Sequence, residues 1–265
     1  MTRIASKPWG ILPFEVNVSR DGPNNGLGHI NKFGHNPSIN KVTVPEYVWS
    51  GGGLYTFTAD GGAPYFISSS SASDTVIINL QILSEDADED WSEEEFTITL
   101  QGQTKVAITT PSGDNPVRFF RGYNTNGTAL VGDVYIYEDD TLTGGIPDTH
   151  TKIRGVINAG DDQTEMAIYT VPSGKDAYFL QGYTQLTNSK STFANFKFAI
   201  RIHGSVFRTR GRASCSNAGQ GSWSYKYSIP PKLPAKTDVI LTCVEVGADG
   251  CAVAAGFDIL LIDTE

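Results

Sequence analysis

The chain has 265 residues, of which 11% are aromatic, 28 are glycine and only 18% carry a charge. This composition is typical of many short strands joined by tight turns rather than of long amphipathic helices. The formal net charge is −9, and an acidic chain offers few of the lysines and arginines that bind phosphate backbones, so we expect no nucleic-acid partner. No segment approaches the ~18–20 consecutive apolar residues of a membrane span, and the first residues lack the apolar core of a secretion signal. We therefore expect no membrane partner, and a protein that is made and used in a cytoplasm or packed into a particle assembled there.

Residues 1–45 differ in composition from the rest of the chain. Turn-forming residues are concentrated in the segments 22–28 and 35–38, and the apolar residues between them follow no regular period. Such a stretch cannot build a core of its own. It is therefore either a flexible leader or, as we predict, an extended N-terminal arm that docks its apolar side chains on a partner. The predicted interface residues are Trp9, Phe14, Ile30, Phe33 and Trp49.

Beyond residue 45 the apolar residues recur with a period of two. The alternation covers the segments 76–82, 96–100, 196–202 and 223–229. Successive side chains of a strand point to opposite faces, so each segment presents one face to a core and the other to solvent. One-sided burial of this kind is typical of antiparallel sheets. The pattern predicts an all-β protein with an antiparallel β-sandwich or jelly-roll-like architecture.

Two sandwich units are consistent with the length of the chain and with a faint internal repeat. The segment RFFRGY at 118–123 resembles YFLQGY at 178–183, and a further strand-like segment follows each of them. We therefore predict two β-sandwich domains after the arm. Their predicted boundaries are 46–160 and 161–265.

Two segments near the C-terminus, 239–246 and 257–262, are apolar on both faces. They are either central strands or parts of a sheet whose outer face is covered by a partner. The three cysteines are expected to be thiols in a reducing compartment, with Cys243 buried as a small apolar residue.

No arrangement of residues points to catalysis. The four histidines, at positions 29, 35, 150 and 203, are dispersed, and none stands at a spacing that predicts a metal site or a catalytic pair. Gly174-Lys175 resembles the end of a phosphate-binding loop, but Tyr169 replaces its first glycine and Asp176 its magnesium-binding hydroxyl residue. The sequence contains no nucleophile elbow and no cysteine–histidine pair in a recognisable order. We therefore predict no enzyme activity, no catalytic residue, no cofactor and no metal site.

The acidic segment 85–95 is the strongest chemical signal in the chain. Asp86, Asp88 and Asp90 have the spacing that opens an EF-hand loop. However, Trp91 stands where that loop needs glycine, and Thr97 stands where it needs a bidentate glutamate. We predict a solvated, charged turn that keeps a strand edge from pairing with other chains. A looser calcium site and a glycosidase-type carboxylate pair are the alternatives.

A set of short motifs gives the chain a family resemblance. The motifs are Ile30-Asn-Lys-Phe-Gly34, Val48-Trp49, Gly51-Gly52-Gly53 with Tyr55, Ser68 to Thr75, Leu100-Gln-Gly102 and Gly160 to Lys175. They recur in this order in a group of structural proteins of tailed bacteriophages that is common among marine phages. The chain resembles this group over roughly residues 28–183, and its last third is similar only in its strand pattern. The resemblance implies a virion component of the β-sandwich type without enzyme activity, although the acidic insertion at 85–95 is longer than the family pattern.

We therefore expect a non-enzymatic structural component of a tailed-phage virion, either a head-decoration subunit or a neck, collar or tail-attached subunit. It would stabilise the particle through repeated contacts with copies of itself, as a homo-oligomer, and with the major capsid, portal, neck or tail proteins. One alternative is a host-glycan-binding or fibre-attachment module. Its aromatic platforms would come from Trp49, Trp91 and Trp223, although Trp223 is better explained as a core residue. A second alternative is a hydrolase that uses acids of segment 85–95.

Overall fold

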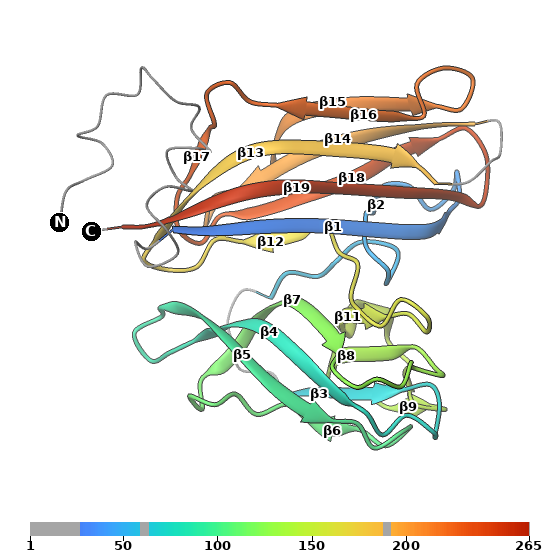
Figure 1. Ribbon diagram of the computed structural model, residues 1–265, viewed down its shortest axis with the longest axis vertical. Helices are drawn as coiled ribbons and strands as arrows, with labels where there is room; N and C mark the ends of the chain where they lie inside the picture. The colour runs from blue at the N-terminus through green and yellow to red at the C-terminus, as the bar shows by residue number, and fades with distance from the viewer. Residues whose placement is uncertain (1–26, 59–63, 188–191, 265) are drawn as a thin grey trace.

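The structure, a computed structural model, describes residues 27–58, 64–187 and 192–264, and these ranges contain no α-helix. Their strands form two antiparallel β-sandwiches, which lie one above the other in Figure 1. The prediction of an all-β protein with antiparallel sandwiches is confirmed. We call the unit that combines strands from both ends of the described chain the terminal sandwich. The unit built from the strands between them is the inserted sandwich.

The terminal sandwich has two sheets. One has the strand order β1-β19-β13-β16 with β17 beside β13, and the other has the order β12-β18-β14-β15 with β2 beside β18. The strands are β1 (Leu27–Ile39), β2 (Glu46–Tyr47), β12 (Ile168–Thr170), β13 (Lys175–Leu186), β14 (Phe193–Arg201), β15 (Arg208–Ser216), β16 (Ser222–Lys226), β17 (Lys232–Leu233), β18 (Asp238–Val246) and β19 (Cys251–Asp263). The two segments that are apolar on both faces lie in β18 and β19, which are both central strands.

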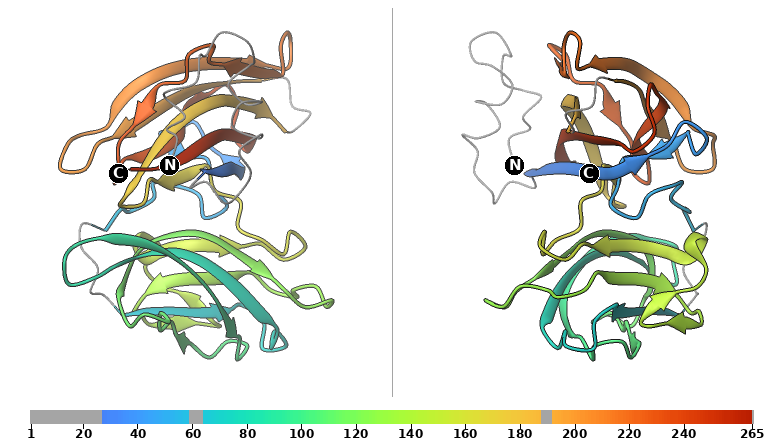
Figure 2. Two further views of the ribbon diagram at one scale, coloured as in Figure 1. Left: turned by 60° about the vertical axis from the view of Figure 1, so that its left-hand side comes forward. Right: turned by 90° about the vertical axis from the view of Figure 1, so that its right-hand side faces the viewer.

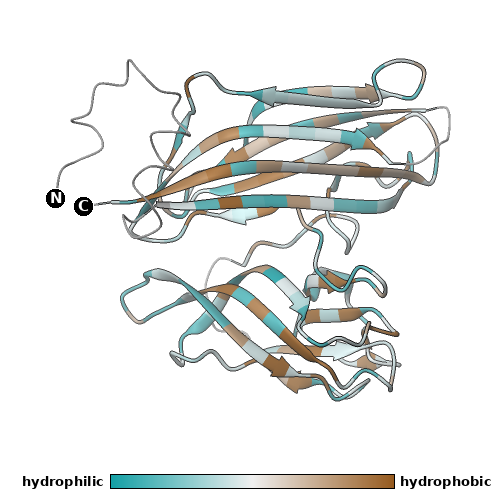
Figure 3. Ribbon diagram, in the orientation of Figure 1, coloured by the Kyte–Doolittle hydropathy of each residue, from teal (hydrophilic) through white to brown (hydrophobic). Residues whose placement is uncertain are grey.

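The inserted sandwich also has two sheets, with the strand orders β11-β8-β3-β6 and β5-β4-β7, and a short β9–β10 ladder beside them. The strands are β3 (Tyr65–Ser69), β4 (Ile77–Glu85), β5 (Trp91–Thr99), β6 (Val106–Ala107), β7 (Asn115–Asn124), β8 (Val134–Glu138), β9 (Leu142–Thr143), β10 (Ile146–Pro147) and β11 (Ile153–Ile157). One 3-10 turn, η2 (His150–Lys152), precedes β11. Figure 3 shows the alternation of apolar and polar residues along β4 and β5 that predicted these strands.

Residues 27–39, which were predicted to belong to the N-terminal arm, form the edge strand β1. This strand pairs with β19 in antiparallel register over nearly its whole length. Its inward-facing positions hold Ile30, Lys32, Gly34 and Asn36, and the last three are buried. Because two of these four residues are polar and one is glycine, the strand shows no apolar alternation in the sequence.

The chain enters the terminal sandwich through β1 and β2, leaves it to build the inserted sandwich, and returns to it at β12. The predicted boundaries at residues 45 and 160 therefore separate β1 and β2 from the sheets that these strands join. The signal that was missed is a long-range pairing, because β1 and its partner β19 lie at opposite ends of the chain.

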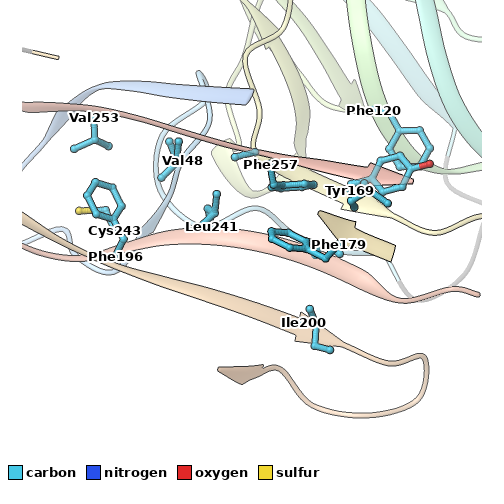
Figure 4. Close-up of a cluster of buried hydrophobic side chains, with 14 of the residues drawn as sticks. Val48, Phe120, Tyr169, Phe179, Phe196, Ile200, Leu241, Cys243, Val253 and Phe257 are labelled. Atoms are coloured by element: carbon cyan, nitrogen blue, oxygen red, sulfur yellow. The ribbon is translucent and has the colours of Figure 1, made fainter. Parts of the chain in front are cut away.

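A shared apolar core joins the two sandwiches. Leu83, Trp91, Val117 and Phe120 of the inserted sandwich belong to the same buried cluster as the interior of the terminal sandwich. Figure 4 shows Phe120 against Tyr169 of β12, with the ring centroids 4.7 Å apart. The interior of the inserted sandwich forms a second buried cluster. A third buried cluster includes Trp49 and Tyr55, which lie in the segment that follows β2.

A buried ion cluster lies beside this shared core. The carboxylate of Asp238 on β18 accepts hydrogen bonds from Arg118 Nε of the inserted sandwich at 3.2 Å and from Arg201 Nη2 at 2.6 Å. It also accepts the hydroxyl of Thr170 at 2.6 Å. The side chains of Asp238 and Arg118 are only 3% and 4% exposed. This cluster connects strands of both sandwiches and fixes how one is placed on the other.

Candidate interaction surfaces

The structure places the five predicted interface residues in three environments. Trp9 and Phe14 lie outside the described residues. Ile30 and Phe33 are both partly buried on β1, where Ile30 packs against the shared core. Trp49 is only 1% exposed, and its ring meets Tyr55 edge-on with the centroids 5.4 Å apart. Trp49 was predicted to contact a partner, but it is a core residue of this chain, because it lies in a buried cluster with Tyr55, Met166 and residues of β11.

Most of the motifs that carry the family resemblance meet at the junction between the sandwiches. Trp49 pairs with Met166 through an isolated β-bridge. Gly34 packs so closely that a Cβ atom there would lie 2.1 Å from the carbonyl oxygen of Val48 and 2.4 Å from the amide nitrogen of Ala167. Only glycine fits such a close approach of three backbone segments.

The same junction contains a buried carboxylate that ties β1 to the chain after β2. The Oε2 atom of Glu46 accepts hydrogen bonds from the Asn36 side chain at 2.9 Å and from the Gly53 amide at 2.8 Å. Glu46 and Asn36 are both buried. Residues 30–34, 48–55 and 160–175 thus determine the joint between the sandwiches rather than an exposed surface.

A polar groove of about 590 Å³ lies between β1 and the sheet β5-β4-β7. Figures 1 and 2 show β1 along the lower side of the terminal sandwich, opposite β4 and β7. The groove is lined by side chains of both signs and by aromatic rings. Its lining includes His29, Lys32, Phe33, Glu93, Glu95, Phe120, Arg121 and Tyr169.

Two ionisable groups in this groove have shifted pKa values. Burial, together with the nearby charge of Arg121, lowers the pKa of Lys32 to about 7. Its Nζ donates a hydrogen bond to the backbone oxygen of Phe120 across the junction. Enclosure in the groove raises the pKa of Glu93, which accepts the hydroxyl of Tyr169 at 3.0 Å. Both contacts run from one sandwich to the other, so these groups hold the joint together.

The acidic segment forms the turn between β4 and β5. The Oδ1 atom of Asp86 accepts the amides of Asp88 and Asp90, each at 2.9 Å, and this internal cap shapes the turn. Trp91 begins β5 with its ring 1% exposed, and its Nε1 donates to Glu85 at 2.7 Å. In the part of the chain that the structure describes, no three His, Cys, Asp or Glu side chains converge as they would around a metal ion.

The glycan-binding alternative depended on three tryptophans. Trp49 and Trp91 are each 1% exposed and cannot stack on a sugar. Trp223 on β16 is partly buried against the shared core, and its ring stacks on Tyr225 with the centroids 6.0 Å apart. Together with Phe179 and Phe198 these rings line an apolar hollow of about 40 Å³ at the open edge of the terminal sandwich.

The hollow is lined by glycines from both sheets of the terminal sandwich. Gly182 on β13 and Gly211 on β15 both line it. A Cβ atom at Gly211 would meet no atom within 4 Å. The hollow therefore marks a region of loose packing between the edge strands β15 and β16.

Comparisons with known proteins give no family assignment. No protein-family model matches the sequence, and no curated protein matches it. No helix in the described ranges is long and apolar enough to span a membrane.

Solved structures with weak similarity include particles of infectious bursal disease virus and an exported protein. The infectious bursal disease virus VP2 subviral particle aligns with 90% of this chain and 72% of its own, at 9% identity and a TM-score of 0.23. The PBSX exported protein XepA aligns with 88% of this chain and 84% of its own, at 8% identity and a TM-score of 0.20. The infectious bursal disease virus Gx strain structure has 8% identity and a TM-score of 0.23, with 89% and 72% covered.

Proposed function

We propose that the chain is a non-enzymatic structural component of a tailed-phage virion, placed at the head surface or at the neck, collar or tail. It is made in the host cytoplasm and incorporated into the particle. Its partners are copies of itself and other virion proteins, such as the major capsid, portal, neck or tail proteins. Its task is to stabilise the particle through contacts that symmetry repeats many times.

One observation carries this proposal: most of the residues that resemble the phage family are the residues that build the joint between the sandwiches. Gly34, Val48 and Trp49 meet Met166 and Ala167 there, and the close backbone contacts leave room for little else. A resemblance in residues that build the joint implies a similar arrangement of the two sandwiches, whereas a resemblance in scattered surface residues would not. The resemblance therefore supports a protein used for its shape.

The ionisable groups of the junction agree with a structural role. Asp238, Arg118 and Lys32 are buried, and their hydrogen bonds go to other groups of the chain. Glu93 is bonded to Tyr169 across the joint. The polar chemistry of the groove is thus used to hold two sandwiches in one arrangement.

The test is the protein's presence in purified particles. Phage particles from a density gradient are digested and analysed by mass spectrometry, with the major capsid protein as the reference for copy number. We expect peptides of this chain at a stoichiometry that fits a symmetric part of the particle. Particle-free lysate of infected cells serves as the control for contamination. Absence of the chain from particles that contain all their major proteins would contradict the proposal.

Imaging of the same particles by electron cryomicroscopy gives the location. Two stacked β-sandwiches should fit density on the head, neck or tail that the other virion proteins leave unassigned. If a copy labelled by a C-terminal tag adds no density at any symmetric position, the chain is not an ordered virion component.

A further inference from the structure

Three exposed arginines of this acidic chain follow one another along one edge of the terminal sandwich. Arg208, Arg210 and Arg212 are all exposed on β15, an edge strand of the sheet β12-β18-β14-β15. Lys197 on the neighbouring strand β14 lies directly opposite Arg212. We call the three arginines the basic edge.

The basic edge differs in its partners from Arg118, Arg154 and Arg201, which lie elsewhere in the described residues. Arg118 and Arg201 pair with Asp238, and Arg154 pairs with Glu138. Across the described residues, no ion pair involves an arginine of the basic edge. Val206, two residues before β15, is 70% exposed and adds apolar surface beside these charges. This edge therefore has the charge and the exposed surface of a contact whose acidic side lies on another molecule.

The complementary negative surface is the turn between β4 and β5 in the inserted sandwich. Asp88, Glu89 and Asp90 are exposed, and within the described ranges none of their carboxylates takes part in an ion pair. The nearby Lys236 donates its hydrogen bond to the backbone oxygen of Glu89 rather than to a carboxylate. We call residues 86–90 the acidic turn. In Figure 1 it projects from the left side of the inserted sandwich, while β15 lies along the top of the terminal sandwich.

We propose that the basic edge of one copy docks on the acidic turn of a second copy. This contact deepens the proposed function, on which it rests, by naming the surfaces through which copies of the chain meet. Opposite charges attract and steer the two surfaces together, whereas two basic edges or two acidic turns repel each other. Charged edge strands are a common guard against aggregation, and here the segregation of the two signs leaves one favoured pairing.

The contact is carried by side chains rather than by an added strand. The pairing of β15 with β14 shifts between Thr209 and Gly211, and this bulge interrupts the straight edge that strand addition requires. Because the two surfaces are different patches of the molecule, the contact is head-to-tail. Head-to-tail contacts close into rings or extend into helical rows, which are the geometries of particle collars and tails.

The experiment uses the full chain and charge reversals of exposed residues. One variant is Arg210→Glu with Arg212→Glu, a second is Asp88→Lys with Asp90→Lys, and a third combines all four changes. The first makes the net charge more negative and the second less negative, so general repulsion cannot explain a loss in both. The combined variant keeps the native net charge of −9. Asp86 is left unchanged because its carboxylate shapes the turn.

Self-association is measured by sedimentation velocity over a range of protein concentrations. We expect the native chain to associate at about 0.05 M NaCl and to dissociate as salt is raised to about 0.5 M, because the Debye length falls from about 14 Å to about 4 Å. Each double variant should weaken self-association at least about tenfold, because like charges then face each other. The combined variant and an equimolar mixture of the two double variants should both recover it.

Three results would overturn the inference: a native chain that stays monomeric at low salt, double variants that associate as the native chain does, or a combined variant that stays as weak as the double variants. Circular dichroism shows that each variant is folded before it is compared. A chain found in virions but monomeric in solution would reject this contact and leave the proposed function standing. A chain that self-associates as described but is absent from virions would reject the proposed function alone.

Discussion

The buried carboxylate of Asp238 offers the sharpest test of how the two sandwiches are joined. Replacing it with Asn keeps the shape of the side chain and removes its charge. The guanidinium of Arg118, only 4% exposed, then loses its counter-ion while it remains enclosed between the sandwiches. Removing one partner of a buried ion pair costs about 3–5 kcal/mol, so we expect Asp238→Asn to lower the free energy of unfolding by that amount.

Two companion variants separate this explanation from a general loss of contacts. Arg201 also binds Asp238, but its side chain is 27% exposed, so Arg201→Ala should cost about 1 kcal/mol or less because water can replace the interaction. The double variant Arg118→Met with Asp238→Leu removes both buried charges and should be within about 2 kcal/mol of the native chain.

Urea unfolding followed by tryptophan fluorescence measures these differences. Trp91 is a reporter of the joint, because the guanidinium carbon of Arg118 lies 5.0 Å from the centroid of its ring. If Asp238→Asn costs less than about 1 kcal/mol, the ion pair is not enclosed between the sandwiches, and it does not fix how they are joined.

Three further changes test other parts of the junction and the terminal sandwich. Gly34→Ala should lower the free energy of unfolding by about 2 kcal/mol or more, because the new Cβ atom would lie 2.1 Å from a backbone oxygen. The control Gly28→Ala on the same strand should be nearly neutral, because its Cβ atom would lie 3.7 Å from the nearest atom. Thermal unfolding compares the two variants. The pKa of Lys32 is lowered from 10.5 to about 7 in the folded state. Between these two pH values the unfolded chain binds more protons than the folded chain, so the contribution of Lys32 to the free energy of unfolding rises with pH. Urea unfolding at pH 7 and pH 9 should therefore show native stability rising relative to that of Lys32→Met, and a constant difference between the two proteins would contradict the burial of this amine. Gly211→Ala should stabilise the chain by about 0.5 kcal/mol, because the new methyl group enters open space and the unfolded chain loses freedom; a lower melting temperature would show that the hollow is absent.

The strands that were predicted from the sequence are those with one apolar face. In β4, Ile78, Leu80 and Ile82 are fully buried and alternate with less buried positions, so a period of two identifies the strand and its core face. The same rule identified β5 and β14, and the apolar character of both faces marked β18 and β19 as central strands.

The rule of a period of two failed for a strand whose buried side chains are polar. β1 places Lys32 and Asn36 inside, and each is compensated by a group on another strand, namely the backbone oxygen of Phe120 on β7 and the carboxylate of Glu46 on β2. Burial of such residues depends on partners that no local pattern reveals. The domain boundaries failed for the same reason, since the strand that seemed to be an arm is completed only by β19.

The interface residues show a related limit of sequence reasoning. Trp49 is a large aromatic residue just before the glycine-rich segment 51–53, and this composition suits an exposed loop as well as a tightly closed one. The structure distinguishes these through the bridge to Met166 and the contact with Tyr55. The ion cluster of Asp238 could not be predicted at all, because Arg118 lies 120 positions away in the sequence.

The use of buried polar groups at the joint is itself informative about the role of the chain. An apolar joint of the same size would hold the two sandwiches at least as strongly, since buried ion pairs add little net stability. What the polar groups add is selectivity, because the buried side chains of Asp238 and Lys32 find all of their hydrogen-bond partners only when the two sandwiches meet in one arrangement. A building block that contacts its neighbours through both sandwiches requires such an arrangement, since an angular error at the joint would be repeated at every copy around a ring. A joint built from buried polar groups is therefore what we expect of a subunit that must hold its two sandwiches in one arrangement.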